Sequence, residues 1–488
     1  MSMLSEFFDL TKDSFSIFQG TKIMQTEYAG YINSFPEVFI SFLEAKNNSS
    51  TVVKYIQQSI KREYDRYSYI FDSLPMYLKE DYLRIYSSLK EVPAVFEHFD
   101  DSLRFLIDSL AYYYKKDVIL LIDEYDTPFI EAWVHGFYEE IHAGLSTMLT
   151  SALKGSDRLQ FAFLTGIQRI ARENIFSDLN NIQVYTVADQ PYSGYFGFTQ
   201  EETEEMLNFF RVPFTPEVKK MYDGYRIGNH EIYNPWSVSN YVHTGRILPY
   251  WVNTSSNKLI KGLLKACDKQ FLAEYDRLIL EGKLKTYVDF RSTFFVSKNN
   301  SALWGLFVNA GYLTIESVIN LGRNLYVLTI PNEEVKEEFQ SFTESCYNLQ
   351  DQSINRIQDA LLEKDSNAFL DAYQSLLMIP SNFDLISENS YHMFMLEISL
   401  TMTATHQILS NREAGKGRAD LILKAKIPGV PSYVFEFKNT RDKAADLNKL
   451  ADQGYQQMID GMYDYQLDGQ IILVSIATKG REIKMKWR

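Results

Sequence analysis

The stretch from Gly415 to Lys438, GKGRADLILKAKIPGVPSYVFEFK, limits the possible folds more than any other part of this 488-residue chain. Two β-rich runs, Asp420–Leu423 and Tyr433–Phe437, flank a connection that contains two prolines and Gly429. Apolar runs separated by proline and glycine are typical of two strands joined by a turn. The sequence therefore predicts a β-hairpin with a somewhat irregular loop.

Side-chain direction in this hairpin decides which charged groups meet. Folding the chain about Gly429 places Asp420 opposite Lys438, with Glu436 one diagonal step away. Because side chains alternate between the two faces of a strand, Glu436 and Lys438 point the same way. Two carboxylates and one ammonium group would then lie on one polar edge of an apolar sheet. The alternative interpretation is a solvated strand on which alternating charges have no further role.

Carboxylates grouped in this way can bind a hard divalent cation. Mg²⁺ takes oxygen ligands and keeps several waters, so one or two carboxylates and the oxygens of a phosphate complete its shell. The bound ion lowers the pKa of its water and neutralises charge that develops on phosphorus. A neighbouring lysine can orient that water or stabilise the charge. The residue types therefore favour metal-dependent phosphodiester chemistry.

The strings GRAD and EFK, which contain these residues, resemble the core of the PD-(D/E)xK nuclease superfamily. The resemblance implies that Asp420 and Glu436 bind Mg²⁺ or Mn²⁺ and that Lys438 is the catalytic lysine. It also implies supporting roles for Glu388, at the start of a helical stretch, and for Gln453, on the helix after the hairpin. The expected reaction is hydrolysis of a phosphodiester bond, with DNA or RNA as the partner.

A second motif follows five consecutive aliphatic residues, Val118–Ile122, which fit a strand buried on both faces of a parallel sheet. Acidic residues at its end resemble a Walker B motif, in which Asp123 would hold Mg²⁺ and Glu124 would polarise the attacking water. A second buried strand is predicted at Leu159–Leu164, and Thr165 at its end is the candidate for a polar sensor residue. The alternative for the acidic pair is that it only starts a helix.

Several longer segments extend the second resemblance. The strings FLTGIQRIARENIFSDLNN, YFGFTQEET and YDGYRIGNHEIYNPWSV, in this order, resemble a bacterial AAA-ATPase-like family that carries a nuclease-type domain at its C-terminus. The phosphate-binding loop G-x-x-x-x-G-K-[S/T] is nowhere in the 488 residues. In that family the loop precedes a helix that reads much like residues 1–8, so we expect this chain to begin just after its loop. We therefore expect a vestigial nucleotide site without ATP hydrolysis.

These patterns predict an α/β multidomain chain with four parts. Residues 1–197 form an incomplete P-loop AAA-like α/β domain that lacks Walker A, and residues 198–345 form an α-rich, lid-like or winged-helix-like region. Residues 346–380 form a helical connector, and residues 381–488 form an α/β/α restriction-endonuclease-like domain. The last two boundaries rest on helical spacing of leucine and alanine, followed by the strand pattern of the hairpin.

Composition restricts the class of protein and the cellular compartment in which it works. Hydrophobic residues make up 45% of the chain, which favours packed domains, and two cysteines offer neither a disulfide framework nor a zinc cluster. The N-terminal segment lacks the basic start of a signal peptide, and no apolar run reaches the roughly 18 residues of a membrane span. We expect a cytoplasmic protein with no membrane partner. The net charge of −14 argues against a protein that coats DNA generally.

Three functions remain in view from the sequence. The first is a Mg²⁺-dependent nuclease on an AAA-like scaffold. The second is an ATP-dependent regulatory or remodelling protein, which requires a phosphate-binding loop upstream of Met1. The third is a catalytically inactive module that binds nucleic acid or protein through the retained fold.

Overall fold

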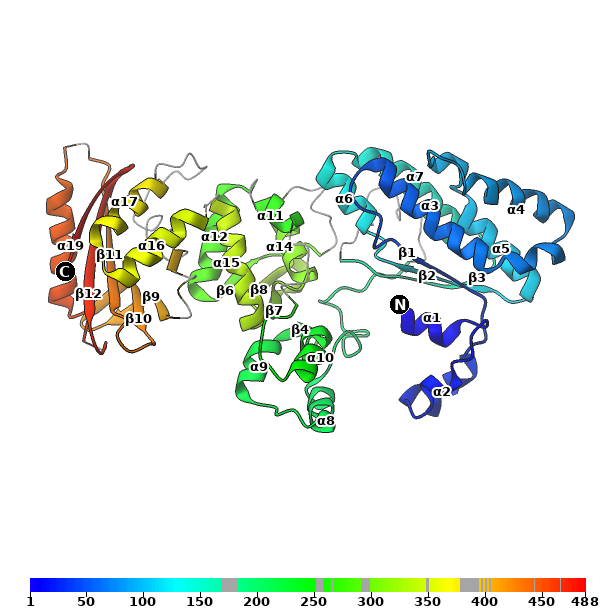
Figure 1. Ribbon diagram of the computed structural model, residues 1–488, viewed down its shortest axis with the longest axis horizontal. Helices are drawn as coiled ribbons and strands as arrows, with labels where there is room; N and C mark the ends of the chain where they lie inside the picture. The colour runs from blue at the N-terminus through cyan, green and yellow to red at the C-terminus, as the bar shows by residue number, and fades with distance from the viewer. Residues whose placement is uncertain are drawn as a thin grey trace. The chain divides into compact units, whose positions relative to one another are not determined.

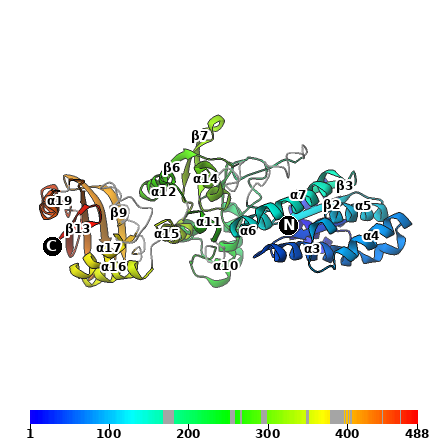
Figure 2. The same cartoon turned by 90° about the horizontal axis from the view of Figure 1, so that it is seen from above.

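The computed structural model describes residues 1–167, 182–251, 258–264, 267–290, 299–347, 351–377, 395, 398–399, 402, 405–442, 444–465 and 467–488. The chain divides into two compact units, of which the first comprises Met1–Ser193, Ile227–Asn229 and Thr286–Tyr326. The second comprises Gly194–Arg226, His230–Lys285 and Val327–Arg488. Figures 1 and 2 label the elements of both units.

The first unit contains a parallel sheet of three strands in the order β1-β2-β3. β1 (Glu37–Ser41) pairs with β2 (Val118–Asp123), and β2 pairs with β3 (Leu159–Leu164). The five aliphatic residues of β2 are at most 2% exposed, which confirms the predicted buried strand. The second predicted strand has the expected bounds, but β3 lies at the edge of the sheet, and its Phe161 is 50% exposed.

Helices bury these strands on the side that carries the large apolar cluster of the unit. Val38, Leu120 and Ile122 share this cluster with α3 (Ser49–Arg66), α4 (Met76–Ser88), α5 (Ser102–Tyr114) and α7 (Tyr138–Lys154). Figure 1 shows α3, α5 and α7 on one side of the sheet and α1 (Ser2–Phe8) on the other. The unit also contains the α-helices α2 (Phe15–Phe18), α6 (Thr127–His135) and α14 (Asn300–Asn309).

The middle of the chain is rich in helices. Its helices are α8 (Gln200–Phe210), α9 (Pro216–Tyr222), α10 (Pro235–Thr244), α11 (Lys258–Leu264), α12 (Lys269–Glu281) and α15 (Glu333–Tyr347). β4 (Tyr225–Ile227) pairs with β5 (His230–Ile232), and β6 (Lys283–Tyr287), β8 (Leu325–Thr329) and β7 (Thr314–Asn320) form a sheet in that order.

A five-stranded sheet in the order β13-β12-β11-β10-β9 dominates the C-terminal part. β9 (His406–Ala414), β10 (Gly417–Ala425) and β11 (Ser432–Asn439) run antiparallel to one another in turn. β12 (Ile471–Lys479) is parallel to β11, and β13 (Glu482–Trp487) is antiparallel to β12.

Helices cover both faces of this sheet, which gives the three α/β/α layers visible in Figures 1 and 2. α16 (Asp351–Glu363) and α17 (Ser366–Leu377) share one apolar cluster with the strand residues Leu421, Phe435 and Val474. α19 (Leu447–Gly461) packs on the opposite face, against Val434, Leu473 and Ala477. The two helices that we assigned to a connector thus form one layer over the sheet, because their apolar faces are buried on it.

Candidate functional site

The hairpin between β10 and β11 has a different register from the predicted one. Leu421 pairs with Phe435 and Leu423 pairs with Tyr433, a register that sets Asp420 level with Glu436. The expected pairing of Asp420 with Lys438 is therefore wrong by two residues. The observed pairs are centred on Pro428 instead of Gly429. The connection contains a tight turn in which Val430 N donates to the Ile427 carbonyl and the third residue, Gly429, has a φ of +86°.

The register error leaves the predicted face unchanged, because side chains repeat every two residues along a strand. Leu421, Phe435 and Phe437 lie in the apolar cluster under α16 and α17. Asp420 and Glu436 therefore point to the opposite face, which α19 partly covers. The meeting of carboxylates on one face, on which the prediction depends, is present.

Asp420 bridges the two strands where their pairing ends. Its Oδ2 accepts a hydrogen bond of 2.8 Å from the backbone N–H of Phe437. Burial raises the pKa of the Asp420 carboxyl above its ordinary value, whereas the Phe437 N–H and the charges of Lys438 and Arg418 act to lower that pKa. The charges of Lys438 and Arg418 thus favour the ionised form of this carboxylate against its burial.

Glu436 and Lys438 form the charged pair that the alternation predicts. Lys438 Nζ lies 2.7 Å from Glu436 Oε1, and the lysine and glutamate side chains are 19% and 2% exposed, respectively. A buried carboxylate is costly without a charged or hydrogen-bonded partner, and the ammonium group provides one. The structure thus brings Asp420, Glu436 and Lys438 together around one patch of the sheet.

Two small residues beside this patch were missed from the sequence. Gly454 of α19 is buried, and a Cβ built on it would lie 2.3 Å from Ser475 Oγ, 3.2 Å from Lys438 Cγ and 3.5 Å from Glu436 Cγ. Ser475 is fully buried on β12 and is the register partner of Glu436. No local signal could have found either residue, because their importance arises from the packing of a helix on a distant strand.

The sequence predicted two further residues at this site, Gln453 and Glu388. Gln453 is exposed on α19, next to Gly454, so the structure places it on the helix over the site. Glu388 lies outside the described residues. Within the described parts of the chain, no group of three or more histidine, cysteine, aspartate or glutamate side chains could hold a metal ion.

The donor chemistry of the patch fits a divalent cation with a small number of protein ligands. Asp420 and Glu436 offer hard carboxylate oxygens from neighbouring strands on the same face. Mg²⁺ and Mn²⁺ complete their shells with waters or phosphate oxygens when a protein provides only one or two carboxylates. Two carboxylates therefore suffice for these ions, whereas a closed structural metal site would need more ligands.

The residues of the predicted nucleotide site meet in part. Thr165 Oγ1 donates a 2.6 Å hydrogen bond to Asp123 Oδ1, and Tyr125 N donates to the Thr165 carbonyl. Glu124 turns elsewhere: its backbone has a φ of +56°, and its Oε2 accepts a 2.9 Å hydrogen bond from Thr127 Oγ1 at the start of α6. Asp123 and Thr165 are thus paired, whereas Glu124 bonds to the Thr127 hydroxyl and is not the N-cap of α6, which is Asp126.

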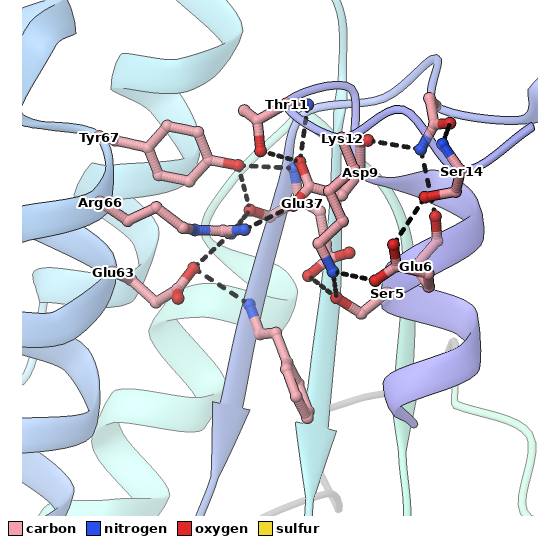
Figure 3. A network of polar contacts seen from close by, with 12 residues as sticks. Ser5, Glu6, Asp9, Thr11, Lys12, Ser14, Glu37, Glu63, Arg66 and Tyr67 are labelled. Carbon is pink, nitrogen blue, oxygen red and sulfur yellow. Dashed lines mark hydrogen bonds and ion pairs between the residues drawn. The ribbon is translucent and has the colours of Figure 1, made fainter.

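A separate polar network surrounds the first residue of β1, where one guanidinium joins several acidic groups (Figure 3). Arg66 Nη1 lies 2.7 Å from Asp9 Oδ2, and its Nη2 lies 2.6 Å from Glu63 Oε2. Nη2 also donates to the main-chain carbonyl of Glu37 at 2.6 Å. Asp9 and Glu37 are fully buried, so the network ties α1, β1 and α3 together in the interior.

The Glu37 side chain is the least satisfied acid of this network. Its Oε1 accepts a 3.0 Å hydrogen bond from Ser5 Oγ, and its Oε2 has no hydrogen-bond partner among the residues that the structure describes. Burial raises the pKa of Glu37 to about 7; the nearby charge of Arg66 opposes this rise, and that of Asp9 adds to it. Glu37 is therefore largely protonated below neutral pH.

Comparison with known proteins supports both resemblances. Residues 1–176 match a family described as predicted AAA-ATPase, and residues 386–488 match the PD-(D/E)XK nuclease superfamily. An uncharacterized protein in the vnfD 5′ region of Azotobacter chroococcum mcd 1 is 30% identical over 227 residues, which is 45% of this chain and 41% of that protein. The match therefore spans about two fifths of the relative's length. None of the helices described here is both long and apolar enough to span a bilayer.

Proposed function

From a chain that joins an AAA-ATPase-like domain to a PD-(D/E)XK nuclease superfamily domain, we propose a metal-dependent nuclease. It hydrolyses phosphodiester bonds of DNA or RNA with Mg²⁺ or Mn²⁺. The observation that carries this proposal is the convergence of Asp420, Glu436 and Lys438 on one face of β10 and β11, where Lys438 Nζ lies 2.7 Å from Glu436 Oε1.

Each residue of the patch has a role that its contacts support. Asp420 and Glu436 would hold the cation, and the Phe437 N–H fixes the direction of the Asp420 carboxylate. When bound, the cation supplies a Lewis acid and lowers the pKa of its water. Lys438 places a positive charge where the attacking water or the developing negative charge needs it. We assign assisting roles to Gln453 and Glu388.

The AAA-like domain acts in this proposal as a scaffold. The 488 residues contain no G-x-x-x-x-G-K-[S/T] string, and backbone amides of that loop are the main anchors of nucleotide phosphates. We therefore propose that this polypeptide does not hydrolyse ATP and that Asp123, Glu124 and Thr165 form a vestigial site. We also place the protein in the bacterial cytoplasm, in line with its two cysteines.

The test uses the purified chain with single-stranded DNA, duplex DNA and RNA, each with Mg²⁺ or Mn²⁺. Asp420→Ala and Lys438→Ala should each lower the cleavage rate by about 100-fold or more, because each removes a charge from the reacting centre. Lys424→Ala is a matched control, because Lys424 lies on the same strand as Asp420 but nearer the connection of the hairpin, directly after Leu423. We expect this variant to cleave at the wild-type rate. The proposal fails if the wild type cuts none of these substrates or if the two variants cut as well as the wild type.

The same experiment separates the rival functions. A catalytically inactive binding module would retain nucleic acid in a gel-shift assay, both before and after Asp420→Ala, without cleavage. An ATP-dependent regulator would bind MgATP, and the Asp123–Thr165 hydrogen bond is the observation that favours it. Binding of MgATP by the 488-residue chain, measured by calorimetry, would replace the scaffold role with a nucleotide-dependent one.

A further inference from the structure

Ser475 on β12 carries a hydroxyl that packing alone does not explain. The residue is 0% exposed, and its Oγ has no hydrogen-bond partner among the residues that the structure describes. Leaving a buried hydroxyl unsatisfied destabilises the folded protein, and alanine would occupy the same place without that cost. The neighbours of Ser475 along the strand, Val474, Ile476 and Ala477, are all apolar and buried.

The close approach of α19 explains the small size of this residue but not its hydroxyl. A Cβ on Gly454 would lie 2.3 Å from Ser475 Oγ, so that a larger side chain on β12 would push the helix away. Alanine and serine both meet this steric limit. An unsatisfied buried polar group in a native structure calls for a specific reason, such as a role in catalysis or a missing ion.

The register of the sheet places this hydroxyl beside a proposed metal ligand. Ser475 and Glu436 are direct partners in the parallel pairing of β11 and β12, so their side chains leave the same face of the sheet. The point at which a Gly454 Cβ would sit is also 3.5 Å from Glu436 Cγ. Ser475 is therefore the polar neighbour of Glu436 on the side away from Asp420.

The present partner of Glu436 is a cation, which conflicts with binding of a second cation. Lys438 Nζ lies 2.7 Å from Glu436 Oε1. When Glu436 ligates a divalent ion, Lys438 cannot keep this position, because two positive charges at such a separation repel each other strongly in a poorly hydrated site. Glu436, which is 2% exposed, then needs another donor to hold its orientation.

We infer that Ser475 is a positioning residue of the metal site: in the cation-bound protein its hydroxyl donates a hydrogen bond to the Glu436 carboxylate and fixes the orientation in which Glu436 binds the ion. This inference rests on the proposed function. Partners of this kind, which bind a ligand rather than the metal, typically change metal affinity by about 10–100-fold when they are removed.

The test is a calorimetric titration of the full chain with Mn²⁺, combined with thermal unfolding of the metal-free protein. Ser475→Ala should bind Mn²⁺ about 10-fold more weakly or worse. Its metal-free Tm should equal or exceed that of the wild type, because the substitution removes an unsatisfied hydroxyl. A merely structural serine would give a lower Tm and an unchanged Mn²⁺ affinity.

Ser432→Ala is the matched control. Ser432 is a 1% exposed serine on β11, and its Oγ accepts a 3.0 Å hydrogen bond from Ala425 N. The control should lose stability and keep the wild-type Mn²⁺ affinity. If Asp420→Ala abolishes Mn²⁺ binding and Ser475→Ala does not change it, the inference is wrong and the proposed function stands. If the wild type itself does not bind Mn²⁺, the proposed metal centre fails, and the role of Ser475 fails with it.

Discussion

Replacing Glu37 by glutamine should make the first unit more stable, and the gain should grow with pH. The folded protein keeps the Glu37 proton up to a pKa of about 7, whereas the unfolded chain loses that proton near the ordinary value of 4.5. Below pH 4.5 the Glu37 carboxyl is protonated in both states and its full contribution to the free energy of unfolding is present. That contribution is lost as the pH rises through about 7. Glutamine stays neutral throughout and avoids this loss.

The structure gives the size of the effect. One pKa unit corresponds to about 1.4 kcal/mol, so the rise from 4.5 to about 7 lowers the free energy of unfolding by about 3 kcal/mol at pH 8. Asp9, Glu63 and Arg66, whose charges act on the same carboxyl, are unchanged in the variant, so the difference between variant and wild type isolates the replacement of Glu37. The side-chain carbonyl of the introduced glutamine can still accept the hydrogen bond from Ser5 Oγ.

Hydrogen exchange of the backbone amides of β1 and β2 in the full chain measures this difference locally. The opening free energy of the variant minus that of the wild type should rise by about 3 kcal/mol between pH 4.5 and pH 8. Glu6→Gln is the control, since hydrogen bonds from Lys12 and Ser14 lower the pKa of Glu6. The opening free energy of Glu6→Gln minus that of the wild type should have the opposite sign and should change only below about pH 5. A Glu37→Gln difference that stays flat across this range would refute the reasoning.

Two further predictions concern contacts at the two candidate sites. Gly454→Ala places a Cβ 2.3 Å from Ser475 Oγ. It should cost about 1–3 kcal/mol through overpacking, seen as a lower Tm of the C-terminal part, and should reduce cleavage more than Gln456→Ala, an exposed substitution on the same helix, does. Thr165→Val removes the donor to Asp123 Oδ1 and should cost about 1 kcal/mol, measured by hydrogen exchange of β2 and β3. An unchanged exchange rate in these strands would contradict that role for the hydroxyl.

Periodicity was the part of the sequence that predicted the structure best. Alternation of side chains along β11 placed Glu436 and Lys438 on one face, and the apolar run of β2 predicted a buried strand that carries Asp123 to its end. The first prediction depends on the two-residue repeat of a strand and the second on a continuous apolar run. Every residue of the strand contributes to either pattern. The predicted register of the hairpin was wrong by two residues because the strands are centred on Pro428, one residue before Gly429.

Packing between distant segments was beyond the reach of the sequence. Neither Ser475 nor Gly454 belongs to a recognisable pattern, and their closeness depends on how α19 lies on β12. The network of Arg66 with Asp9 and Glu37 likewise joins groups from three elements. In the sequence, charged residues that belong to such a buried network cannot be distinguished from charged residues on the surface.

The glycine contact of α19 also determines the direction of access to the patch. With no side chain between helix and sheet at Gly454, the space above Ser475 and Lys438 Cγ is filled by the helix itself. In the proposed nuclease, a group that approaches Glu436 from directly above Ser475 would meet α19, so a side chain added at Gly454 would have to displace the helix itself.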